Sequence, residues 1–259
     1  MSEATGLIVL RAAIAIIAAG VGGLIGISWK KSSHRTLCAL VSFAAGALLA
    51  VTVVNIIPES TEMVGLLPGL AATFAGLIVF YLIGKYVYYL CPACAASASE
   101  ANTGYLQLGV LLMVALAIHS AVDGLAIAAS THAHHEAVAV LVLLAVSYHK
   151  VPEGLALVSV SRLAGYTRWR AFGLTLLIEL TTGLGAFIGL MVLNALTDFW
   201  QGMILGVVGG SFLYVVGFAL IREMMEHERK SILGYLVIGF ISIMALGLIL
   251  QSFGIVHSH

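Results

Sequence analysis

Six ionisable residues lie inside hydrophobic stretches of the chain, where charged groups are costly. They are His119, Asp123, His149, Lys150, Glu153 and Glu179. A charged group at the centre of a bilayer costs at least about 2.5–3.5 kcal/mol on insertion scales. These groups must therefore be compensated by one another or by an ion. A salt-bridge network that only orients helices is the alternative, but two imidazoles matched with carboxylates favour an ion.

The spacing of these residues indicates a metal site. His119 and Asp123 are four residues apart, as are His149 and Glu153, and residues four apart share one face of a helix. Two such helices packed face to face would supply two imidazole nitrogens and two carboxylate oxygens. That ligand set suits Zn²⁺, with Fe²⁺, Mn²⁺, Co²⁺ and Cd²⁺ as further candidates.

The two stretches also resemble each other. Each reads His, three residues, a carboxylate and then Gly-Leu-Ala, starting at His119 and at His149. Consecutive spans cross the bilayer in opposite directions, so the repeat predicts a pseudo-twofold axis in the membrane plane. Inverted repeats around a central site are typical of alternating-access transporters. Pro152 and the glycine after each carboxylate are expected to loosen the backbone beside the ligands.

The elements that must position these residues are membrane spans. The chain has 259 residues, 61% of them hydrophobic and 9% charged, with a mean hydropathy of +1.09; a soluble domain carries about 25% charged residues. We predict an all-α integral membrane protein with one domain over residues 1–259, and seven spans is the alternative to eight. The eight predicted spans cover roughly residues 5–29, 36–59, 67–90, 105–130, 137–161, 169–194, 200–221 and 232–255.

The charges predict the orientation of these spans. Nine of the twelve Lys and Arg residues fall in the first, fifth and seventh connections, and none in the second, fourth or sixth. Cytoplasmic loops collect basic residues, so both termini are expected outside the cytoplasm, with the protein in the cell (inner) membrane.

A net charge of zero argues against nucleic acid as a partner. Three cysteines are too few and too poorly placed for a disulfide framework.

On these motifs the sequence resembles the ZIP (Zrt/Irt-like) family of divalent metal transporters, in its bacterial or GufA-like branch. The family signatures stand here as His119-Ser120-x-x-Asp123-Gly124 in the fourth span, His149-x-x-Pro152-Glu153-Gly154 in the fifth, Asn55-Ile-Ile-Pro58-Glu59 at the end of the second, and Glu179 in the sixth. The resemblance covers nearly the whole chain, and eight spans with outer termini fit it.

The resemblance implies import of Zn²⁺ and similar ions toward the cytoplasm, with no cofactor and without ATP hydrolysis. It also implies a homodimer in the lipid bilayer, and a rigid unit of the first, fourth, fifth and sixth spans sliding against the rest. The candidate metal-contacting residues are His119, Asp123, His149, Glu153, Glu179, Ser120, Asn55 and Glu59.

Two features depart from the family pattern. Lys150 stands where members with two metals carry an acidic ligand, so we expect it to replace the second ion and to pair with Glu179 or a bridging carboxylate; the alternative is that it turns toward a membrane interface. The third connection lacks histidine and carries Cys91 and Cys94, half a zinc site at most.

An outer cluster of polar residues follows the fourth span and consists of His132, His134, His135 and Glu136. It either concentrates ions or is an ordinary solvated loop.

Two other functions compete with metal transport. An intramembrane zinc-dependent hydrolase would usually keep an open water position beside a general base, and its common H-E-x-x-H signature is absent. A channel or a proton-linked transporter would need no metal. We therefore predict a transporter and not an enzyme.

Overall fold

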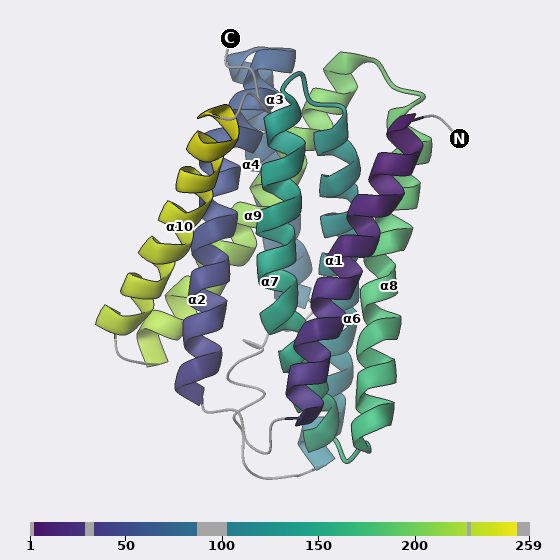
Figure 1. Ribbon diagram of the computed structural model, residues 1–259, viewed down its shortest axis with the longest axis vertical. Coiled ribbons are helices and arrows are strands. Elements are labelled where there is room, and N and C mark those ends of the chain that lie inside the picture. The colour runs from purple at the N-terminus through teal and green to yellow at the C-terminus, as the bar shows by residue number, and fades with distance from the viewer. Residues whose placement is uncertain (1–2, 29–33, 87–102, 227–228, 253–259) are drawn as a thin grey trace.

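The protein is a bundle of long helices (Figure 1). The computed structural model describes residues 3–28, 34–86, 103–226 and 229–252, and within these ranges it contains helices and no strand. The helices are α1 (Glu3–Ser28), α2 (His34–Val51), the π-helical turn η1 (Thr52–Ile56), α3 (Ile57–Val64), α4 (Leu66–Tyr86), α6 (Thr103–Thr131), α7 (Glu136–Leu163), α8 (Arg168–Leu193), α9 (Asp198–Glu226) and α10 (Arg229–Ser252).

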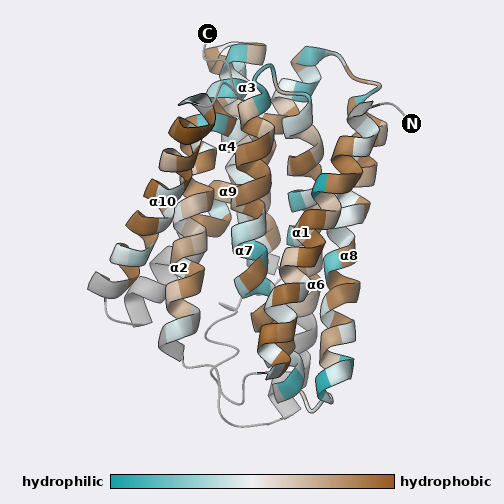
Figure 2. Cartoon of the chain, viewed as in Figure 1, coloured by the Kyte–Doolittle hydropathy of each residue, from teal (hydrophilic) through white to brown (hydrophobic). Residues whose placement is uncertain are grey.

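Within the described residues, eight helical stretches are long and apolar enough to cross a membrane, which confirms the prediction of eight spans. They are Thr5–Ser28, Cys38–Val64, Leu66–Lys85, Met113–Thr131, Glu136–Arg162, Arg168–Leu193, Asp198–Gly217 and Ile232–Leu250. Inside lipid a helix satisfies its own backbone hydrogen bonds, and Figure 2 shows hydrophobic residues along most of the helix surfaces. The protein is therefore a multi-pass membrane protein.

The second span extends further than the sequence predicted. It was expected to end at Glu59, but it continues to Val64 through the π turn η1. Ile57 donates its backbone N–H to the carbonyl of Thr52, five residues back. Pro58 then occupies the first turn of α3, where its missing N–H costs no helical hydrogen bond. The π turn therefore allows the helical chain to continue past Pro58.

The helices form two groups. Helices α1, α6, α7 and α8 pack mainly against one another, as do α2, α3, α4, α9 and α10. The main contact between the groups is that of α7 with α2. The first group corresponds to the first, fourth, fifth and sixth spans, the set that the family resemblance treats as one unit.

Four pairs of helices cross where glycines face the backbone of the partner. A methyl group on Gly22 of α1 would lie 1.9 Å from the carbonyl oxygen of Val151, and one on Gly154 of α7 would lie 2.0 Å from that of Ala19. The other crossings are Gly124 with Gly185 (α6 and α8), Gly46 with Gly239 (α2 and α10), and Gly76 with Gly210 (α4 and α9). Such small residues let membrane helices approach closely.

The crossings have the symmetry that an inverted repeat predicts. Exchanging α1 with α8, α2 with α9, α4 with α10 and α6 with α7 converts each crossing into another one. The exchanged helices also run in opposite directions (Figure 1). Gly124 and Gly154, the glycines that follow the two carboxylates, lie at these close helix contacts.

The two ends of the bundle differ. The start of α1, the end of α10, α3 and the α6–α7 turn lie at one end (Figure 1). The opposite end carries the α7–α8 connection with Arg162, Arg168 and Arg170, and the last turn of α4 with Lys85. Lys30 and Lys31, used in the orientation prediction, lie outside the described residues, as do Cys91 and Cys94.

Candidate metal centre

Helices α6 and α7 bring the four predicted ligands together. His119 and Asp123 lie on α6, and His149 and Glu153 on α7. One ligand atom from each lies within 4.8 Å of the other three. Three of the side chains are buried and that of His149 is 11% exposed. The i, i+4 spacing therefore places both ligands of each helix on the facing surfaces.

Asp123 lies between the two imidazoles. Its Oδ2 is 3.1 Å from His149 Nε2, and its Oδ1 is 3.7 Å from His119 Nε2. The ring centroids of the two histidines are 5.3 Å apart. Both Nε2 atoms are thus directed at one carboxylate.

The other nitrogen of His149 fixes the orientation of its ring. Nδ1 lies 3.2 Å from the carbonyl oxygen of Ala145. A carbonyl only accepts a hydrogen bond, so Nδ1 carries the hydrogen and Nε2 faces Asp123. Either a proton or a cation can then join Nε2 to the carboxylate. Two ligands about 2.0–2.1 Å from a tetrahedral ion lie roughly 3.4 Å apart, close to the 3.1 Å found here.

Lys150 lies fully buried among oxygens. Its Nζ is 2.9 Å from each of Asp123 Oδ2, Glu153 Oε2 and Glu179 Oε2, and it donates to Ser120 Oγ at 2.6 Å. The Ser120 hydroxyl donates in turn to Glu153 Oε1 at 3.1 Å. The predicted pairing with Glu179 is confirmed, and the alternative that Lys150 turns toward an interface is wrong.

The oxygens around Lys150 exceed what the lysine can satisfy. An ammonium has three hydrogens for four surrounding oxygens. Three ionised carboxylates and one ammonium leave the centre with a formal charge of −2, which one divalent cation would neutralise. Among the described residues, His119 Nδ1, Asp123 Oδ1 and Glu179 Oε1 are buried without a hydrogen-bond partner. Buried polar atoms are normally paired, so this centre retains capacity to bind a cation.

The remaining predicted residues lie in other positions. Ser120 and Glu179 contact Lys150 directly. Asn55 lies half-buried on the π turn η1, and π turns occur often at functional sites. Glu59 lies in the first turn of α3, and its partners come from the α6–α7 turn.

Of the three clustered histidines, His135 is the one whose side chain lies beside carboxylates. Both ring nitrogens of His132 lie 3.0 Å from protein oxygens, those of Ala128 and Asn194, while His134 is exposed. His135 Nδ1 lies 2.7 Å from Glu59 Oε2 and 3.8 Å from Glu62 Oε2. The hydrogen bond with Glu59 raises the pKa of the His135 imidazole, against a smaller effect of burial.

Glu62 is a further candidate ligand that the sequence prediction did not include. Glu62 follows Glu59 by three residues, a spacing that places both on one helix face. Such a pair beside a predicted histidine cluster was the available signal.

Arg11, another charged residue within a span, donates to Thr131 Oγ1 at 2.8 Å. It therefore ties α1 to the end of α6.

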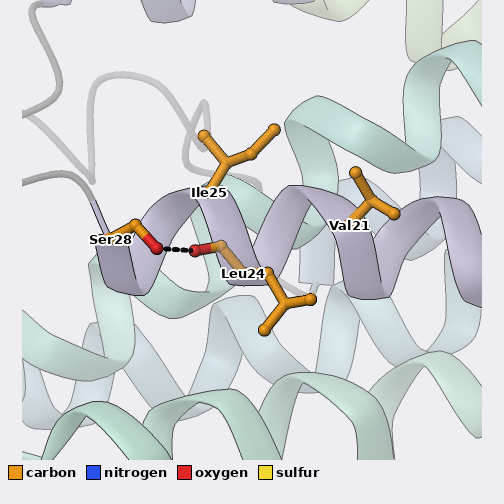
Figure 3. Close-up of a pocket in the computed structure, with 4 residues that line it drawn as sticks. All are labelled: Val21, Leu24, Ile25 and Ser28. Carbon is orange, nitrogen blue, oxygen red and sulfur yellow. Dashed lines mark hydrogen bonds between the residues drawn. The ribbon is translucent and has the colours of Figure 1, made fainter.

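An open pocket on α1 lies away from these groups. Its lining is Val21, Leu24, Ile25 and Ser28, and the Ser28 hydroxyl donates to the Leu24 carbonyl at 2.8 Å (Figure 3). None of these side chains is ionisable. The pocket is part of the apolar outer surface and contains no candidate metal ligand.

Within the described residues, eight apolar helices are long enough to span a membrane, and α6 and α7 carry a group of two histidines and two carboxylates that could hold a metal ion. These features define a multi-pass membrane protein with a candidate metal centre inside its bundle. The sequence profile of the ZIP zinc transporter family matches residues 95–247 of the chain. The chain is 32% identical over 257 residues to the zinc transporter ZupT of Chlorobium luteolum, an alignment that covers 92% of this chain and 96% of that protein. It is also similar to the zinc transporters ZupT of Lysinibacillus sphaericus (29% over 252 residues, 90% and 93% covered) and Chlorobium limicola (31% over 256 residues, 92% and 96% covered).

The chain therefore belongs to the ZIP zinc transporter family. This membership confirms the resemblance found from the motifs. It also makes the protein a transporter and not an enzyme, as the sequence analysis predicted.

Proposed function

We propose that the protein carries Zn²⁺ across the membrane, one ion at a time, through His119, Asp123, His149 and Glu153. The observation that carries this proposal is the buried convergence of these four side chains, whose ligand atoms lie within 4.8 Å of one another. The similar ZupT proteins are zinc transporters, which supports Zn²⁺ as the cargo. The same nitrogen and oxygen ligands also suit Fe²⁺, Mn²⁺, Co²⁺ and Cd²⁺.

Charge favours a single ion in this centre. The formal charge of −2 left by three carboxylates and Lys150 is balanced by one divalent ion, whereas two ions would leave an excess of +2. A buried unbalanced charge costs several kcal/mol. Lys150 thus occupies the position of a second ion and supplies one positive charge there, with Ser120 and Glu179 holding its ammonium group.

The arrangement of the helices supports alternating access. All four ligands, Lys150 and Glu179 belong to the group α1, α6, α7 and α8, so the ion and its ligands can move together past α2, α3, α4, α9 and α10. Asn55 lies on the π turn of the other group. We propose it as a transient ligand as the ion enters or leaves.

The basic end of the bundle supports the proposed orientation in the membrane. Basic residues gather on cytoplasmic loops, so the end with Arg162, Arg168 and Arg170 faces the cytoplasm and both termini face outward. In the cell (inner) membrane, import then runs from the end with α3 toward the arginines. Homodimer formation in the bilayer is part of the proposal, on the strength of the family resemblance alone.

Zinc uptake into proteoliposomes tests this function. Vesicles containing a zinc-sensitive dye should fill faster with the wild-type protein than without protein. At zinc concentrations below saturation, His149→Ala should reduce the rate to that of empty vesicles, because it leaves three of the four ligands. His134→Ala, which changes an exposed histidine, is the matched control and should transport at the wild-type rate. Equal uptake by His149→Ala and wild type would rule out the assigned site.

A further inference from the structure

A second group of potential metal ligands lies at the end of the bundle that carries α3. It consists of Glu59 and Glu62 on α3 and His135 at the end of the α6–α7 turn, with one ligand atom of each within 4.8 Å of the others. His135 Nδ1 is directed at both carboxylates, 2.7 Å from Glu59 and 3.8 Å from Glu62. Two oxygens and one imidazole nitrogen thus face a single point.

Glu59 is held in place from several directions. Its side chain is 3% exposed, and its Oε1 accepts hydrogen bonds from the backbone N–H groups of His134 and His135, the latter at 3.2 Å. The next residue, Ser60, donates to the carbonyl of Gly202 on α9 at 2.8 Å. A ligand carboxylate fixed by protein contacts loses little freedom when it binds an ion.

The backbone contacts of Glu59 do not explain the whole group. A carboxylate that caps the start of α7 needs neither a second carboxylate nor an imidazole beside it. Glu62, whose side chain is 58% exposed, and His135, at 33%, leave the group open on one side. Ions can therefore reach it from outside the bundle, in contrast to the buried centre on α6 and α7.

The charge and the ligand types select the kind of ion. With a neutral imidazole, the two carboxylates give the group a formal charge of −2. Three protein ligands of mixed nitrogen and oxygen type, with positions left for water, suit Zn²⁺ and neighbouring divalent transition metals better than Ca²⁺ or Mg²⁺.

The group also spans the boundary between the two sets of helices. Glu59 and Glu62 belong to the set of α3, whereas His135 belongs to the set of α6 and α7. An ion bound here would therefore be shared by both sets, and the complete ligand set requires them to be adjacent at this end.

We propose that Glu59, Glu62 and His135 form a second, solvent-accessible site for a Zn²⁺-class ion, separate from the transport centre. The site goes beyond the proposed function, because its existence does not depend on passage of the ion through the membrane. It binds ions more weakly than the buried centre, since it offers three ligands and is partly open to water.

Counting bound zinc tests the site. The full-length protein in detergent micelles is dialysed against buffered free Zn²⁺ over a range of concentrations, and zinc per chain is measured. Wild type should bind two ions in two steps, and the double variant Glu62→Gln, His135→Ala should lose the weaker one or bind it at least about tenfold less tightly, because two of three ligands are removed. His134→Ala should match wild type.

A third variant separates this site from the transport centre. His149→Ala should lose the tighter ion and keep the weaker one, even if the proposed transport route is wrong. A wild-type protein with one ion per chain, or a double variant with an unchanged weaker step, would overturn the proposal. Both altered residues of the double variant are partly exposed, and the tighter step serves as its internal check of folding.

Discussion

Replacing Lys150 with methionine tests how the buried centre balances its charge. The change removes the ammonium group and keeps a similar side-chain volume. Asp123, Glu153 and Glu179 would each lose a contact of 2.9 Å, leaving three carboxylates facing one another inside the bundle. Removing one partner of a buried ion pair destabilises a protein by about 3–5 kcal/mol. We expect a loss of this size with a zinc chelator present.

Zinc should restore much of this loss. A ligand that binds only the folded state stabilises it by about 2.7 kcal/mol at one hundred times its Kd. The more negative centre of Lys150→Met should bind zinc more tightly, so added Zn²⁺ should raise the midpoint of thermal unfolding more in the variant than in wild type. Tryptophan fluorescence of the protein in detergent, with chelator or with zinc, measures both values.

The control for this experiment is Lys85→Met. Lys85 is exposed in the last turn of α4, so its replacement should leave the midpoint with chelator and the zinc-induced shift close to those of wild type. If Lys150→Met were as stable as wild type in chelator, Lys150 would not be holding the carboxylates together. The charge balance would then be wrong.

Three further predictions concern packing and pH. Gly124→Ala would place a methyl group 1.9 Å from the Thr182 carbonyl oxygen and should destabilise the protein by about 1–3 kcal/mol or more. Its control is Gly173→Ala on α8, where the added methyl group would lie in open space and should not destabilise the protein. Equal unfolding midpoints of the two variants would contradict the close crossing of α6 and α8. Zinc affinity of the buried centre should fall between about pH 7 and pH 5, because protons compete for imidazole nitrogens; calorimetry that shows flat or tighter binding would refute this. Because Glu59 raises the pKa of His135, their pair stabilises the protein below the unfolded imidazole pKa of about 6.5, and this contribution is lost as the pH rises through the folded pKa. In chelator, the gap in unfolding midpoint between wild type and His135→Ala should therefore be larger at about pH 6 than at about pH 8; a gap that grows with pH would contradict the pairing.

Much of the site could be predicted because its residues are related by short-range spacing. Each His and carboxylate pair is four residues apart on one helix, and helical geometry alone places both on one face. The repetition of the motif on consecutive spans then implied that the two faces meet. The eight spans follow from apolar runs, which have few alternatives in a membrane.

Long-range contacts could not be predicted in the same way. Glu59 and Glu62 lie more than seventy residues from His135 in the sequence, and nothing local distinguishes His135 from His132 or His134. The full set of oxygens around Lys150 depends on how α8 packs against α6 and α7. The π turn before Pro58 also has no simple signature, and it shifted the end of the second span by five residues.

The most direct test of the central claim is anomalous diffraction at the zinc absorption edge from crystals of the wild-type protein. The account predicts one strong peak within the bundle, at zinc–ligand distances of about 2.0–2.2 Å from His119, Asp123, His149 and Glu153. The Lys150 ammonium group should lie beside it with no ion in its place. Two zinc peaks in the bundle core, or none among these four residues, would contradict the claim.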